Sequence, residues 1–177
     1  EGFADVTLTG ENPLDRTGVS VFIVKDMNQD GYDELLVGAP QNDANGMDDG
    51  KVFFFKGRPQ AAWKRHYSVS EADAIFWGEE REGWAGFSVT DVGDVNGDGI
   101  ADIGICARRA EKVYLIFGRE EMDWGQNFNL DNADVEIHRE NNLKDWGTGW
   151  LMGPAGDVNG DGYSDFLISA TKPEEWS

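Results

Sequence analysis

One short acidic segment occurs three times in this chain and constrains its fold more than any other feature. The copies are KDMNQDGYDE at 25–34, GDVNGDGIAD at 93–102 and GDVNGDGYSD at 156–165. Aligned on their first acids, Asp26, Asp94 and Asp157, they are 68 and 63 residues apart. Recurrence at this spacing predicts a linear array of structural repeats with a period of about 65 residues.

Other segments keep the same spacing. ADVTLTGEN, ADAIFWGEE and ADVEIHREN begin at Ala4, Ala72 and Ala133, and GKVFFFKGR (50–58) is repeated as EKVYLIFGR (111–119). Apolar segments also flank every acidic loop, with GVSVFIV, GFSVTDV and GWLMGPA before and ELLVGA, DIGICA and DFLISA after. They are rich in β-branched and aromatic residues, and apart from one possible turn within 61–73 no helical period appears.

Four short strands in each unit of about 60 residues are typical of a propeller blade. We therefore expect an all-β fold, an open arc or partial β-propeller of about three four-stranded antiparallel blades. The expected order is a strand in 1–10, repeat one at about 11–80, repeat two at about 81–141 and an incomplete repeat three at about 142–177. Because so few blades leave open edges, we expect a partner chain or residues outside this sequence to complete the ring.

The second loop explains the acidic pattern. Counting from Asp94, positions 3 and 5 are Asn96 and Asp98, Gly99 permits a sharp turn at position 6, and Asp102 is position 9. In a tightly curled loop these alternate side chains point to a common centre, and the carbonyl at position 7 turns inward. The donors are oxygens, mostly anionic, with no His or Cys among them, which favours calcium before magnesium or zinc.

Two alternative loop types fit less well. An EF-hand needs a glutamate at position 12 and flanking helices, but position 12 here is Val37, Ile105 or Ile168, within apolar strands. Dockerin-like modules, with helices after their paired loops, are disfavoured for the same reason. Asp, Asn and Gly are also common in ordinary hairpin turns, but three loops in register favour calcium-binding hairpins. The first loop departs most, because position 9 is Glu34 with Asp33 beside it, and either residue can complete the ligand shell.

Together these features resemble the FG-GAP repeat of integrin α-subunit propellers and their bacterial relatives. The GAP element is present at 38–40 and degraded at 106–108 and 169–171, and FG-like elements lie at 18–19, 86–87 and 149–150. The resemblance covers nearly the whole chain. It implies seven-bladed propellers as the usual architecture, calcium in hairpins on one face, and adhesion or ligand binding as the commonest role.

The resemblance also implies a set of calcium ligands, in which the residue at position 7 contributes only its carbonyl oxygen. They are Asp26, Asn28, Asp30, Tyr32 and Glu34 in the first loop, Asp94, Asn96, Asp98, Ile100 and Asp102 in the second, and Asp157, Asn159, Asp161, Tyr163 and Asp165 in the third. Weak sites of this kind suit millimolar calcium, so we expect an extracellular, periplasmic or organelle-lumen location.

Composition limits the partners. The net charge of −19 argues against nucleic acid and anionic membranes, and no apolar run approaches the length of a membrane span. The single cysteine, Cys106, lies in an apolar strand and is expected to be a buried, inert thiol. Neither histidine has a nucleophile nearby in sequence, so we expect no enzymatic activity from the chain itself.

The aromatic residues leave two interpretations open. Trp84, Trp146 and Trp150 lie near the FG-like elements and are expected to pack between blades. Trp63, Trp77, Trp124 and Trp176 either pack in the same way or form an aromatic platform for a sugar or a partner protein.

Three function classes remain. The favoured one is a calcium-stabilised adhesion or binding scaffold for a protein or carbohydrate ligand. The others are an accessory propeller of a secreted enzyme acting on polysaccharide or lipid, and a structural subunit of a large assembly. Because every acidic loop joins the same pair of strands, we expect all three on one face and the partner-binding surface on the opposite face.

Overall fold

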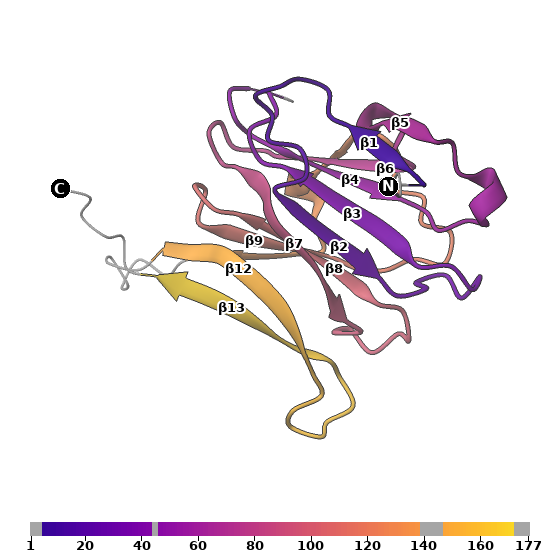
Figure 1. Ribbon diagram of the computed structural model, residues 1–177. Helices are drawn as coiled ribbons and strands as arrows, with labels where there is room; N and C mark the ends of the chain where they lie inside the picture. Colours follow the sequence, from indigo (N-terminus) through magenta and orange to yellow (C-terminus); the bar gives the residue numbers. More distant parts are fainter. Residues whose placement is uncertain (1–4, 44–45, 139–146, 172–177) are drawn as a thin grey trace.

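The computed structural model describes residues 5–43, 46–138 and 147–171, and its regular structure is almost entirely strand (Figure 1). This confirms the all-β fold. The strands are β1 (Thr7–Thr9), β2 (Ser20–Val24), β3 (Glu34–Ala39), β4 (Lys51–Phe55), β5 (His66–Ser68), β6 (Ala74–Trp77), β7 (Ala85–Gly93), β8 (Asp102–Ala107), β9 (Lys112–Ile116), β10 (Phe128–Asn129), β11 (Val135–His138), β12 (Gly147–Gly156) and β13 (Asp165–Thr171).

Helical structure among the described residues is limited to three single 3₁₀ turns, η1 (Gln60–Ala62), η2 (Val69–Glu71) and η3 (Leu130–Asn132). The one turn expected within 61–73 is thus replaced by two. None of the helices in this part of the chain has the length and apolar character needed to span a membrane.

The first sheet contains four antiparallel neighbours in the order β6-β4-β3-β2. The second sheet repeats this arrangement as β11-β9-β8-β7, and β12 and β13 form a third antiparallel hairpin. The central strand β4 is buried along its whole length because sheets and loops cover both of its faces. β2 is an edge strand, and its alternate residues Val21 and Ile23 remain exposed.

Short parallel strands join successive units. β5 pairs with β1 through Thr7 and His66, and β10 pairs with β6 through Phe128 and Phe76. A 3₁₀ turn and then β6 or β11, the outermost antiparallel strand, follow β5 and β10 respectively. Each unit therefore adds a strand to the outer edge of the unit before it. The sequence did not predict β5 and β10, because two or three residues are too few to show the alternation of apolar and polar side chains that marks a strand.

Apolar side chains fill the space between sheets. The core between the first two sheets takes Leu36, Val52, Phe54 and Phe76 from one and Val89, Ile103, Ile105 and Tyr114 from the other. On the far side of the second sheet, Met152, Phe166 and Ile168 of the third hairpin pack against a smaller cluster that includes Val92 and Leu115. The units are thus stacked face to face in chain order.

Two glycines bring the first two sheets into backbone contact. A Cβ atom built on Gly38 in β3 would lie 2.1 Å from the carbonyl oxygen of Gly86 in β7, closer than any real contact. The Ser20 hydroxyl donates a hydrogen bond to that same oxygen at 2.7 Å. Gly86 itself has a φ of 83°, a conformation that favours glycine. The GAP element of one unit therefore packs directly on the FG-like element of the next.

The structure tests the expected positions of some of the tryptophans and of the single cysteine. Trp124 is only 6% exposed and packs against Phe54 and Phe76, so a platform role for it is wrong. Trp146, Trp176 and the side chain of Trp150 lie outside the described residues.

Cys106 is fully buried, which confirms the expected burial, and this burial raises the pKa of its thiol to about 12.

The close contact between Gly38 and the Gly86 carbonyl predicts that a single added methyl group at Gly38 lowers the stability of the protein. Gly38→Ala should lower the free energy of unfolding by about 1–3 kcal/mol, because the sheets must separate to admit the Cβ atom. Gly153→Ala is the matched control, since nothing lies within 4 Å of its Cβ position in β12. Urea unfolding of both variants measures the difference, and equal stabilities would contradict the proposed close packing.

Candidate metal centre

The three acidic loops occupy the same end of their sheets. Each joins the first two strands of a unit, β2 to β3, β7 to β8 and β12 to β13 (Figure 1). The second and third loops touch, because the Ser164 amide donates to the Asp94 carbonyl oxygen at 2.8 Å. Sheet stacking therefore gathers loops that lie more than 60 residues apart in the sequence.

All three loops are closed by the same four hydrogen bonds. The position-1 side chain accepts the amide N–H of position 6 at 2.8–3.1 Å, and position 9 accepts that of position 2 at 2.8–2.9 Å. Between them, position 3 accepts the amide of position 5 and position 5 accepts that of position 7, at 2.8–3.2 Å. The repeated sequence thus produces one repeated loop conformation.

The backbone conformation of the loops explains why glycine recurs at positions 4 and 6, and it shows that the first loop differs at position 4. Positions 4 and 6 have positive φ, with values of 80° and 89° at Gly97 and Gly99 in the second loop. Position 4 of the first loop is Gln29, with a φ of 59°. A non-glycine residue there costs roughly 1 kcal/mol, so the first loop holds its shape less easily.

The acid at position 9 is the most buried member of the first two loops. Glu34 and Asp102 are both fully buried. Burial raises the pKa of each carboxyl group, although amide hydrogen bonds, from Met27 to Glu34 and from Gly118 to Asp102, oppose the shift. The neighbouring loop acids add to the raised pKa by charge repulsion. Keeping these two groups ionised therefore costs free energy, which a bound cation would reduce.

The second oxygen differs between the two buried acids. Asp102 Oδ1 accepts the Gly118 amide at 2.8 Å. Glu34 Oε1 is buried without a hydrogen-bond partner in the described part of the chain. The amide of Gly57, the counterpart of Gly118, lowers the pKa of Glu34 but does not reach hydrogen-bond geometry at Oε1. This buried, unpaired anionic oxygen is a ready ligand for a cation.

The third loop is more open. Asp157 is exposed, and the amide of Gly162, followed by those of Gly160 and Asp161, holds its pKa below the ordinary value. Tyr163 at position 7 is 49% exposed, compared with 40% for Tyr32 in the first loop. The tyrosine side chains at position 7 are thus partly exposed in both loops.

The structure brings the expected ligands of each loop onto one short curled segment, but it does not gather their carboxylates. Across residues 5–43, 46–138 and 147–171, no three His, Cys, Asp or Glu side chains are close enough together to hold a metal ion. Their oxygens accept backbone amides instead, and the Asn96 side-chain amide donates to Asp98 at 2.9 Å. The ligand assignment of the fifteen residues therefore stays a prediction.

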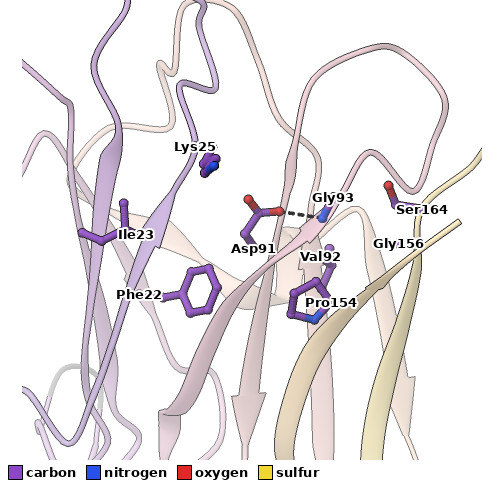
Figure 2. Close-up of a pocket in the computed structure, with 9 residues that line it drawn as sticks. All are labelled: Phe22, Ile23, Lys25, Asp91, Val92, Gly93, Pro154, Gly156 and Ser164. Carbon is purple, nitrogen blue, oxygen red and sulfur yellow. Dashed lines mark hydrogen bonds between the residues drawn. The ribbon is translucent and has the colours of Figure 1, made fainter.

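A cavity that sequence analysis did not anticipate lies beside the loops. It has a volume of about 250 Å³ and is mostly apolar, and Figure 2 shows Phe22 and Pro154 on opposite walls. Asp91 is oriented by the Gly93 amide, which donates to its carboxylate at 2.6 Å. The walls come from β2, β7 and β12, so only the stacking of three units forms the cavity.

The buried acids predict responses of different size to neutral substitution in chelator at pH 7. Glu34→Gln should change the free energy of unfolding by less than about 1 kcal/mol, because the removal of a buried charge offsets the burial of an NH₂ group at the position of the unpaired Oε1. Asp102→Asn should lower it by about 1–3 kcal/mol, because its NH₂ group would face the Gly118 amide. Urea unfolding would contradict this if Glu34→Gln were the more harmful change.

Comparison with known proteins places these loops in context. Residues 17–55 match the family model described as FG-GAP repeat. Phosphatidylinositol-glycan-specific phospholipase D of Bos taurus is 32% identical over 156 residues, which make up 82% of this chain and 17% of that protein. Integrin alpha-IIb of Mus musculus is 30% identical over 175 residues, or 92% of this chain and 16% of that protein.

A further relative, integrin alpha-2 of Bos taurus, is 28% identical over 134 residues, which make up 73% of this chain and 10% of that protein. The chain thus spans less than a fifth of the length of each of these relatives.

Proposed function

Because the chain belongs to the FG-GAP repeat family and has integrin α-like relatives, we propose that it is part of a calcium-binding propeller that serves as an adhesion or binding scaffold. In this proposal each antiparallel sheet is one blade, and the hairpin β12–β13 begins a further blade. The repeat boundaries near residues 11, 81 and 142 stay part of the proposal. The ring is completed by a partner chain or by further repeats.

The unpaired oxygen of Glu34 is the observation that carries the calcium assignment. The loops supply carboxylate, amide and carbonyl oxygens in the number and kind that calcium prefers. When bound, the ion would neutralise acids that otherwise repel one another and would tie the two strands of each hairpin together. Three ions would change the net charge from −19 to about −13. The ion's role in this scaffold is structural.

The proposed scaffold works outside the cell or in another calcium-rich compartment, where millimolar calcium keeps weak sites filled. Its ligand is a protein or carbohydrate, and its net charge disfavours nucleic acid. We assign no catalytic role to the chain itself.

A second candidate comes from the relative named as a phospholipase D, with which 82% of this chain aligns. In that alternative the chain is an accessory propeller that supports a catalytic domain elsewhere in a longer protein. Activity assays on the intact protein separate this role from a binding scaffold. A structural subunit of a large assembly would instead be recovered in stoichiometric amounts with its complex.

Calcium should stabilise the chain through the loops. Saturation of one site at about 100 times its dissociation constant adds roughly 2.7 kcal/mol to the free energy of unfolding. Asp98→Asn and Asp161→Asn should each remove about that increment, because each deletes a central charged ligand. Glu34→Ala should reduce the calcium response by a smaller amount, if the neighbouring Asp33 turns inward to replace the lost carboxylate.

Asp123→Asn is the matched control, because it makes the same charge change on a largely exposed side chain outside the loops. Thermal unfolding with calcium and with chelator provides the measurement. Identical midpoints in the two conditions would refute the calcium assignment, and an unaltered calcium response in Asp98→Asn would refute the ligand set.

A further inference from the structure

Three arginines surround one tryptophan at the end of the sheets opposite the acidic loops. The guanidinium carbons of Arg109, Arg16 and Arg108 lie 5.0, 6.0 and 6.0 Å from the ring centre of Trp84. Arg108 also lies 4.7 Å from the ring of Phe87, which stacks on Trp84 with 6.3 Å between centres. We name this group, Arg16, Arg108, Arg109, Trp84 and Phe87, the arginine–tryptophan cluster.

Topology places the cluster away from the acidic loops. Arg16 precedes β2, Trp84 precedes β7, and Arg108 and Arg109 follow β8. The acidic loops lie at the other ends of these same strands, so a ligand at the cluster would not touch them. The cluster is formed by two successive units, and neither contains it alone.

The backbone at the cluster is strained and held in place. Trp84 has a φ of 61°, which is unusual for a bulky residue, and Glu82 has a φ of 58°. The Trp84 amide donates to the Asp48 carbonyl at 3.1 Å, and the Arg109 amide donates to Gly83 at 3.0 Å. The indole Nε1 of Trp84 is buried without a partner among the described residues. Strain held by surrounding bonds is a feature of functional sites.

The cluster gathers three guanidinium groups at one ring in a chain whose net charge is −19. Glu82 is an acidic neighbour of these groups. Arg109 and Glu82 approach to 3.6 Å, but both side chains are about half exposed, so this pair is weak. The planar guanidinium group suits a carboxylate with two parallel hydrogen bonds, so the arginines around Trp84 are donors of the kind that an acidic side chain requires.

Exposed apolar side chains border the cluster. Leu14 is 83% exposed and Val19 is 52% exposed, and both lie within three residues of Arg16. Met47 is 46% exposed, and its carbonyl accepts the Glu82 amide. An apolar border beside cations suits a peptide better than a sulfated polysaccharide, because a long polyanion would be repelled by the rest of this acidic protein.

We propose that the arginine–tryptophan cluster binds an aspartate or glutamate side chain from a protein partner, within a segment that carries apolar residues on either side of the acid. The inference rests on the proposed scaffold role but not on calcium. Trp84 and Phe87 supply the aromatic surface, and Arg16 and Arg109 supply the donors to the carboxylate.

The test uses a capped synthetic peptide with one aspartate between leucine and phenylalanine. The indole NMR signal of Trp84, assigned by its loss in Trp84→Phe, should shift saturably as the peptide is added. Arg16→Gln and Arg109→Gln should each weaken binding about tenfold or more, the loss expected for a charged hydrogen bond. Arg119→Gln is the matched control, since Arg119 lies 5.8 Å from the Trp124 ring and is similarly exposed, and it should bind as the parent does.

Three outcomes would overturn the proposal. One is equal binding of a peptide with asparagine in place of aspartate, and another is equal binding by Arg109→Gln and the parent. The third is tighter binding of a heparin-derived oligosaccharide through the same arginines. Two variants distinguish failure of this proposal from failure of the proposed calcium sites. Arg109→Gln should keep the full stabilisation by calcium, and Asp98→Asn should keep the shift of the Trp84 indole signal on addition of the peptide.

Discussion

The backbone contact between Gly38 and Gly86 sets the distance between the first two sheets, and the core and the strand ends that these sheets share depend on it. With no Cβ atom at Gly38, the carbonyl of Gly86 lies against β3 and accepts a hydrogen bond from Ser20. That spacing lets apolar residues of both sheets meet in one core. It also aligns strand ends, so that the turns of successive units lie side by side.

Aligned strand ends give the molecule two chemically different ends. At one, three loops carry acids whose side chains accept backbone amides in the same order each time. At the other, connections between strands bring three arginines to Trp84. The strands between them hold these charges apart, so the proposed metal sites and the proposed peptide site lie at separate ends of the sheets.

The buried acid at position 9 links stability to the proposed function. Glu34 and Asp102 accept the amide at position 2 and thereby close their loops, yet burial opposes their negative charge. A cation bound beside these carboxylates would favour their ionised form and so oppose the cost of burying the charge. Calcium would then add stability where the apolar core adds little, at the exposed ends of the hairpins.

The sequence by itself determined the repeat, the strands flanking each loop and the all-β class, because period, β-branched composition and glycine placement are local properties. It also located the acidic loops, whose closing bonds join residues at most seven positions apart. Tertiary structure alone decided the short parallel strands, the burial of Trp124, the cavity walled by β2, β7 and β12, and the cluster around Trp84. Each of these depends on which units stack and how closely, and that is fixed by contacts between residues tens of positions apart, which no local pattern encodes.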